Sequence, residues 1–245
     1  MVHFWKVVNE VLKQSDIVLE VVDARFPDKG RNEEIEGKLK SMKKDFILVL
    51  NKADLLKLEE RKSVDVKYYV YVSALQNLGT TKLRTLIKRL SNKETTNIGI
   101  VGYPNAGKSS LINVLRQRKV AGTSSMPGFT KGVQKIRLSK GLYLLDTPGV
   151  YEYREKDDEK LSWIGAKSAD KVRDPEYVAM KILSEAKPEE IENAYGVECN
   201  EDINELIEEI ALKLNYYKKG KTPDTDRVSR KIIRDWQQGK FQKAI

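Results

Sequence analysis

The hydrophobic positions of this chain form short continuous runs that are separated by segments with a helical repeat. Six runs of β-branched, aromatic or aliphatic residues are too short for helices and predict strands. Most of the segments between them carry apolar residues three and four positions apart, which predicts helices. Strands that alternate with helices indicate a mostly parallel sheet with helices on both faces. The predicted strands are 17–22, 46–50, 68–72, 98–101, 133–138 and 142–145, and the predicted helices lie near 5–14, 32–44, 55–62, 80–91 and 107–118.

The strand pattern stops after Tyr153, and helical periodicity continues to the end of the chain. Gly196 and Gly220 break this region, and Asp or Pro stands near the start of each predicted helix. We therefore expect an α/β domain over residues 1–153 and a small all-α domain over residues 154–245. The predicted helices of the second domain are 174–186, 188–193, 202–214 and 226–238.

Cysteine content and hydropathy indicate the cellular compartment of the chain. One cysteine, Cys199, cannot form an internal disulfide, and no apolar run approaches the roughly 20 residues that a membrane span needs. The first residues lack the pattern of a signal peptide. We therefore expect a reducing, cytoplasmic location and no membrane association.

The net charge of +9 is distributed unevenly along the chain. Residues 1–150 hold 27 Lys and Arg against 15 Asp and Glu, residues 151–212 hold 8 against 18, and residues 213–245 hold 10 against 3. Such separation favours contact with a polyanion through particular surfaces, although a solvated lysine-rich exterior would also account for any one patch.

A phosphate-binding loop follows the fourth predicted strand. Its sequence from Gly102 to Ser109 is GYPNAGKS, and the next predicted helix starts there. Glycines let backbone N–H groups approach phosphate, and the helix N-terminus adds positive potential. Lys108 would bridge the outer phosphates and the Ser109 hydroxyl would bind Mg²⁺.

A second phosphate-side motif, Asp146-Thr147-Pro148-Gly149, follows the sixth predicted strand. Asp146 would hold Mg²⁺ through water, and the Gly149 N–H would face the γ-phosphate. Taken alone this sequence would suit an ordinary turn, but beside a phosphate loop it favours a nucleotide site.

Residues 51–54, Asn-Lys-Ala-Asp, have the chemistry to recognise guanine. The Asp54 carboxylate can accept from the guanine ring N–H and amino group together, a donor pair that adenine does not offer. Asn51 would meet the carbonyl side of the base, and the stem of Lys52 would cover one face. In Ser73-Ala74-Leu75, the Ala74 N–H would support the guanine carbonyl. The expected nucleotide-binding residues are Asn51, Lys52, Asp54, Ser73, Ala74, Asn105, Ala106, Gly107, Lys108, Ser109 and Ser110.

In an ordinary small GTPase the guanine-reading segment follows the phosphate loop. In this chain it precedes the loop by about fifty residues, so the order of the motifs is rotated. With Asp23-Ala24-Arg25-Phe26-Pro27, Arg31-Asn32, Pro127-Gly128-Phe129-Thr130 and the phosphate loop, the chain resembles the YlqF/YawG-type circularly permuted GTPases. The likeness is strong over about residues 5–153 and looser to Lys240. It implies a circularly permuted P-loop GTPase domain and a role in ribosomal subunit assembly.

The resemblance also implies roles for single residues. Thr130 would be the switch threonine that reaches Mg²⁺ and the γ-phosphate, and Asn105 is similar to the asparagine that marks potassium-activated GTPases. Lys108, Thr130 and Gly149 would then form the catalytic set. Val150 stands where many GTPases carry a water-orienting glutamine, so another group must orient the water. The Phe-Pro-Gly-His-Met segment of bacterial members is absent, and His3 is the only histidine.

We therefore expect a GTP hydrolase that binds a ribosomal subunit, its RNA, Mg²⁺ and K⁺. The residues that would contact RNA phosphates are Lys218, Lys219, Lys221, Arg227, Arg230, Lys231 and Arg234. An alternative is a nucleotide-gated binding module in which hydrolysis is incidental, and Asp54 disfavours a P-loop kinase or ATPase. The sequence does not define the oligomeric state.

Overall fold

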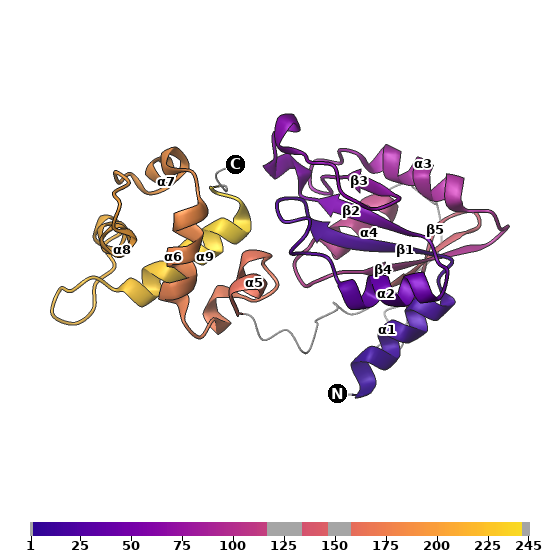
Figure 1. The fold of residues 1–245 in the computed structure, drawn as a ribbon, viewed down its shortest axis with the longest axis horizontal. Coiled ribbons are helices and arrows are strands. Elements are labelled where there is room, and N and C mark those ends of the chain that lie inside the picture. The colour runs from indigo at the N-terminus through magenta and orange to yellow at the C-terminus, as the bar shows by residue number, and fades with distance from the viewer. Residues whose placement is uncertain (1, 117–133, 147–157, 242–245) are drawn as a thin grey trace. The chain divides into compact units, whose positions relative to one another are not determined.

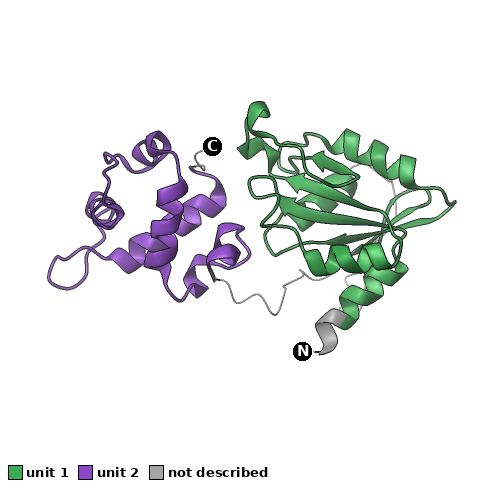
Figure 2. Ribbon diagram, in the orientation of Figure 1, with its two compact units in different colours: residues 1–152 green, residues 153–245 purple. Residues whose placement is uncertain are grey.

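The computed structural model describes residues 2–116, 134–146 and 158–241. The chain divides into two compact units, residues 1–152 and 153–245 (Figure 2). The first unit combines a sheet with helices, and the regular elements described in the second unit are helical. None of the helices within these described ranges is long and apolar enough to cross a membrane.

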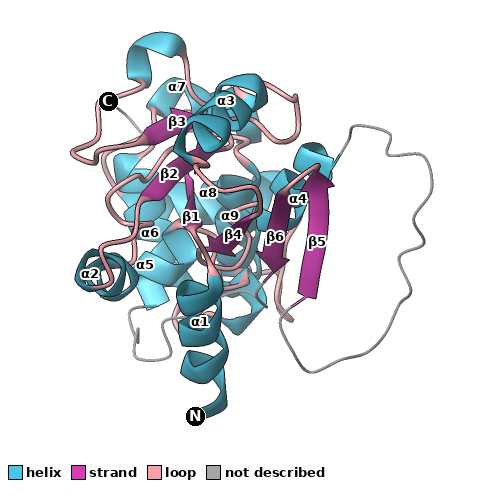
Figure 3. Ribbon diagram, turned by 90° about the vertical axis from the view of Figure 1, so that its right-hand side faces the viewer, coloured by secondary structure: helices cyan, strands magenta, loops and turns pink. Residues whose placement is uncertain are grey.

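A six-stranded sheet forms the centre of the first unit, with the strand order β3-β2-β1-β4-β6-β5 (Figure 3). All neighbours pair in parallel except β5 and β6, which pair antiparallel at one edge. This sheet confirms the predicted fold class and every predicted strand. The strands are β1 Ile17–Asp23, β2 Phe46–Asn51, β3 Tyr69–Tyr71, β4 Thr96–Val101, β5 Gln134–Ser139 and β6 Leu142–Asp146.

Both faces of the sheet are covered because successive side chains of a strand point to opposite sides. Ile17 and Leu19 of β1 belong to a core cluster with α3 and α4, whereas Val18 packs with α1 and α2 on the other face (Figure 1). All seven residues of β1 are buried, as expected for a central strand with helices on both sides. The helices of this unit are α1 Val2–Gln14, α2 Glu33–Ser41, α3 Thr80–Leu90 and α4 Lys108–Arg116.

The helix expected near 55–62 was a wrong prediction. Two short 3-10 turns, η1 Ala53–Leu55 and η2 Leu58–Glu60, stand there instead. Arg61 Nη2 donates to the Ala53 carbonyl at 2.9 Å, and the Tyr71 hydroxyl donates to the Lys62 carbonyl at 2.8 Å. These tertiary bonds hold the segment as a loop against β3, which outweighs its modest helical propensity.

The second unit is built on packed helices with an aromatic core. The rings of Trp163 and Trp236 lie 5.1 Å apart edge to face, and Phe241 contacts both Trp236 and Tyr195. Edge-to-face rings add to the stabilisation that burial gives. The four predicted helices are present, and α5 was missed by the sequence analysis. The elements are α5 Asp158–Trp163, η3 Ala169–Lys171, α6 Pro175–Glu185, α7 Pro188–Tyr195, α8 Ile203–Lys213 and α9 Thr225–Gln238.

Candidate nucleotide-binding site

The predicted motifs gather at the carboxyl edge of the sheet. Asn51 is the last residue of β2, Ser73 follows β3, Gly102 follows β4, and Asp146 ends β6. In open parallel sheets this edge is where ligands bind. The strand order places β1 between β2, which leads into residues 51–54, and β4, which leads into the phosphate loop.

The phosphate loop has the backbone geometry that an anion cradle requires. Gly102, Asn105 and Gly107 have φ values of 142°, 59° and 93°, and α4 starts at Lys108. The Lys108 Nζ donates to the carbonyls of Gly102 at 2.8 Å and Tyr103 at 2.6 Å. Its ammonium therefore lies folded over the loop, at a helix N-terminus whose exposed N–H groups favour a phosphate.

Asn51 ties three motifs together. Its Nδ2 donates to the Ala106 carbonyl in the phosphate loop at 2.9 Å, and its Oδ1 accepts from the Ala74 N–H at 3.0 Å. A Cβ on Gly107 would overlap the Asn51 Nδ2, so this glycine permits the close approach of the two segments. Asn51 is only 2% exposed, so both bonds are shielded from water.

The Asn51 bonds bear on the predicted base contacts. The sequence analysis assigned Asn51 and the Ala74 N–H to the carbonyl side of guanine, whereas in this structure they bond to each other. Their direct contact with a base stays a prediction. The observed bond from Asn51 to Ala106 sets the spacing between residues 51–54 and the phosphate loop.

Asp54 has an unusual environment for a carboxylate. It is the middle residue of η1, which begins directly after Lys52. The backbone of Lys52 is left-handed with φ 61°. The Asp54 Oδ1 is buried and has no hydrogen-bond partner among the described residues. A buried carboxylate oxygen without a partner is costly, so a ligand that donates to it would be stabilised there.

Ser73 shapes the turn after β3. Its backbone pairs with Leu78 in both directions at 3.0 Å, and its Oγ accepts from the Gln76 N–H at 3.0 Å. The side chain of Ser73 is fully buried. It therefore holds the Ala74 N–H in position from within the protein.

The predicted metal ligands are only partly described. Ser109 and Ser110 are exposed in the first turn of α4, and β4 pairs with β6 so that Ile100 lies opposite Asp146. Thr130, Gly149 and Val150 lie outside the described residues. Among the described residues, no group of three or more His, Cys, Asp or Glu could hold a metal ion. A hydroxyl and one carboxylate are hard oxygen donors that suit Mg²⁺, which keeps waters and phosphate oxygens as its other ligands.

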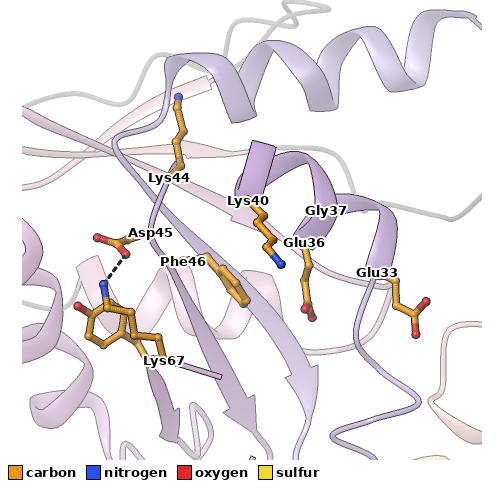
Figure 4. A pocket seen from close by; sticks show the side chains of 9 residues that line it. Glu33, Glu36, Gly37, Lys40, Lys44, Asp45, Phe46 and Lys67 are labelled. Atoms are coloured by element: carbon orange, nitrogen blue, oxygen red, sulfur yellow. Dashed lines mark hydrogen bonds and ion pairs between the residues drawn. The ribbon is translucent and has the colours of Figure 1, made fainter. Parts of the chain in front are cut away.

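A pocket of about 380 Å³ lies at the opposite, amino end of β2 and β3 (Figure 4). Two of its three lysines are engaged, since Lys67 pairs with Asp45 at 3.2 Å and Lys44 donates to three carbonyls at the end of α1. Phe46 and Tyr68 line it from the strand side. It is separate from the motif-bearing edge of the sheet.

Asp23 and Arg25 form a buried ion pair, with Nη2 and Oδ2 2.9 Å apart, that was not predicted from the sequence. In the sequence these residues carried only part of the family resemblance, although Asp23 ends β1 and is 2% exposed beside Asn51. A carboxylate at the end of a central strand, two residues before an arginine, was the available signal.

The sheet order, the phosphate loop and the position of residues 51–54 define a P-loop GTPase whose motifs are circularly permuted. Residues 97–218 match the family described as "50S ribosome-binding GTPase", and residues 35–155 match the family described as "RsgA GTPase". A GTP-binding protein of Methanocaldococcus jannaschii is 43% identical over 96% of this chain, and nucleolar GTP-binding protein 2 of Saccharomyces cerevisiae is 32% identical over 98%. The chain spans 65% and 52% of the lengths of these two relatives.

The structural comparison gives the same fold. The crystal structure of GNP-bound YlqF from T. maritima has a TM-score of 0.70, 24% identity, and coverage of 98% of this chain and 96% of its own. These findings bear out the resemblance of the chain to the YlqF/YawG-type circularly permuted GTPases.

Proposed function

We propose that this chain binds GTP and GDP with Mg²⁺ and hydrolyses GTP during ribosome assembly. The observation that carries the proposal is the unpartnered, buried Asp54 Oδ1, in a segment that Asn51 bonds to the phosphate loop. A guanine base would supply the missing donors, whereas adenine would leave the carboxylate without them.

The residues at the phosphate side have distinct roles in this proposal. Lys108 exchanges its carbonyl partners in the loop for the β- and γ-phosphates, and the backbone of residues 105–107 lines the anion. Ser109, Thr130 and, through water, Asp146 would hold Mg²⁺, which would neutralise charge on the phosphates. The Gly149 N–H would face the γ-phosphate. Asn105 binds K⁺, consistent with its left-handed backbone and exposed position in the loop.

The proposed partners are a ribosomal subunit and its RNA. The family description names a 50S ribosome-binding GTPase, and the first 150 residues and the last 33 both carry an excess of cations. Positive surfaces attract the phosphates of RNA without regard to sequence. Cytoplasmic location belongs to the same proposal.

Nucleotide preference is the decisive test. Asp54→Asn should move preference from guanine toward xanthine nucleotides, because an amide donates where xanthine presents a carbonyl. Lys108→Ala is the matched comparison, since it should weaken GTP and xanthosine triphosphate alike. Competition binding with both triphosphates measures this, and an Asp54→Asn protein that keeps the GTP affinity of the parent would exclude Asp54 as base reader.

The rate of GTP hydrolysis distinguishes a GTP hydrolase from a nucleotide-gated binding module. Val150 offers no group to orient water, so we expect slow intrinsic hydrolysis, on the order of the 10⁻⁴ s⁻¹ of an unassisted small GTPase. Purified large ribosomal subunits should accelerate phosphate release. If subunits bind in a GTP-dependent way and leave the rate unchanged, the chain is a nucleotide-gated binding module.

A further inference from the structure

Asp23 ends the strand that separates the two halves of the proposed nucleotide site. Its backbone pairs with Asn51 in β2, and the Ala24 N–H donates to the Asn51 carbonyl at 2.7 Å. On its other side β1 pairs with β4, the strand that leads into the phosphate loop. The pairing of β1 with β2 therefore places Asp23 next to the proposed guanine-reading segment.

Two cations share the Asp23 carboxylate. Arg25 Nε donates to Oδ1 at 3.0 Å and its Nη2 to Oδ2 at 2.9 Å, while the Arg25 backbone N–H donates to Oδ1 at 3.1 Å. The Lys52 Nζ lies 2.9 Å from Oδ2. A forked arginine contact of this kind fixes a carboxylate in one orientation, which leaves Oδ2 aimed at the lysine.

Burial makes this cluster more than a surface ion pair. The side chains of Asp23 and Arg25 are 1% and 4% exposed, whereas that of Lys52 is 23% exposed. Burial by itself would raise the pKa of Asp23, but Arg25 and Lys52 lower it below the ordinary value, so the carboxylate stays charged. Arg25 also lies over the Phe26 ring at 5.1 Å. The anchor is rigid, and the flexible member is the lysine that precedes Asp54 by two residues.

We propose that Asp23 and Arg25 are positioning residues for the guanine base: they hold the Lys52 ammonium so that its methylene stem lies along one face of the base. The inference rests on the proposed function, because it gives Lys52 a task only if Asp54 reads guanine. A lysine side chain has four rotatable bonds, so one that is already held loses less freedom when a base packs on it. Arg25 acts through Asp23, and Asp23 acts through Lys52.

A double-mutant cycle on GDP affinity tests this chain of action. Asp23→Asn and Lys52→Met should each weaken GDP binding about tenfold, and the double variant should also be about tenfold weaker, because both changes remove the same constraint. Isothermal titration with GDP and Mg²⁺ gives the affinities. A hundredfold loss in the double variant, or no loss in either single variant, would overturn the inference.

Unfolding measurements distinguish positioning from simple support of the fold. If Asp23 only stabilises the sheet, its coupling to Lys52 appears in the denaturant unfolding of the nucleotide-free protein and is missing from the GDP affinities, and the inference is then wrong. If Asp23→Asn does not fold, Lys52→Met decides: lost GDP affinity with parental stability supports the proposal, and unchanged affinity overturns it.

Asp16→Asn is the matched control. Asp16 lies just before the other end of β1, where its carboxylate pairs with Lys93 at 2.6 Å and accepts the Asn97 N–H at 2.8 Å. The variant removes a comparable lysine partner far from the motifs and should leave GDP affinity unchanged. A parent protein without measurable GDP binding would refute the proposed function instead, whereas a GDP-binding parent with an indifferent Asp23→Asn variant refutes this inference alone.

Discussion

Asn51→Asp tests whether a single buried amide holds the two halves of the nucleotide site together. The substitution is isosteric and keeps an oxygen for the Ala74 N–H. It replaces the Nδ2 donor with an oxygen that faces the Ala106 carbonyl, at a position where the original contact is 2.9 Å. The phosphate loop therefore loses its bond to β2 while the turn after β3 keeps its own.

The expected cost follows from burial. Asn51 is 2% exposed, so the Ala106 carbonyl loses its Asn51 donor in a site shielded from water. A buried group that loses its partner costs about 1–3 kcal/mol. The carboxylate of Asn51→Asp also faces the carbonyl oxygen, which adds to its cost. Asn51→Ala removes both bonds and leaves a small cavity, so its loss should be roughly 2–6 kcal/mol for the two groups together.

Denaturant unfolding of the nucleotide-free protein measures these losses in stability. GDP titration shows whether the affinity for the nucleotide falls as well. Asn204→Asp, on the exposed part of α8, adds the same charge in the second unit and should change neither quantity. If either Asn51→Asp or Asn51→Ala matches the parent in stability, the proposed link through the buried amide is refuted.

Two further predictions concern pH and monovalent ions. Burial raises the pKa of Glu20 to about 8, reinforced by Glu36 and opposed by the Asn32 N–H. The folded state then keeps a proton that the unfolded chain releases above its ordinary pKa of 4.5, so the free energy of unfolding should fall between about pH 4.5 and 8, by at most about 1.4 kcal/mol per pH unit. Glu20→Gln should remove this slope in denaturant titrations, and an unchanged slope would contradict the assignment. Replacing potassium by sodium should lower GTP turnover if Asn105 holds a monovalent cation at the phosphates; equal rates in both salts would exclude that role.

The features that could be predicted from the sequence are those that short-range patterns encode, namely the strands and the phosphate loop. Each of the six strands is a compact apolar run, and the phosphate loop carries its glycines and lysine in one continuous segment. The Asn51 bonds were beyond such reasoning because their partners lie 55 and 23 residues away in the chain. Their geometry depends on the strand order, which the local pattern does not specify.

The wrong prediction of a helix near 55–62 has a physical cause of the same kind. The segment near 55–62 has helical periodicity, yet the contacts of Arg61 and Lys62 with neighbouring segments hold it as a loop. The arginines of α9 share a helix face in sequence, but Arg230 is bound in place: Nε and Nη2 donate to Asp226, and Nη1 donates to the Ala169 carbonyl at 2.8 Å. These bonds link α9 to η3, and the RNA phosphate contact of Arg230 stays a prediction.

The turn before α9 carries the other cations of the RNA prediction. Lys218, Lys219 and Lys221 are exposed in the turn that the Tyr217–Pro223 bridge closes. Replacing all three with alanine should weaken binding to ribosomal RNA and reduce the log–log salt slope by about 0.7–0.9 per lost phosphate contact, because each neutralised phosphate releases counterions.

Arg230→Ala is the opposite case to the lysine variant. It should lower the stability of the second unit, because the Asp226 carboxylate and the Ala169 carbonyl lose a shared donor, and it should leave the salt slope as it is. Filter binding across a salt series, with unfolding curves for both variants, gives the two quantities. If Arg230→Ala flattens the salt dependence and the lysine variant does not, then α9 itself meets the phosphates, and the internal bonds of Arg230 must open when RNA binds.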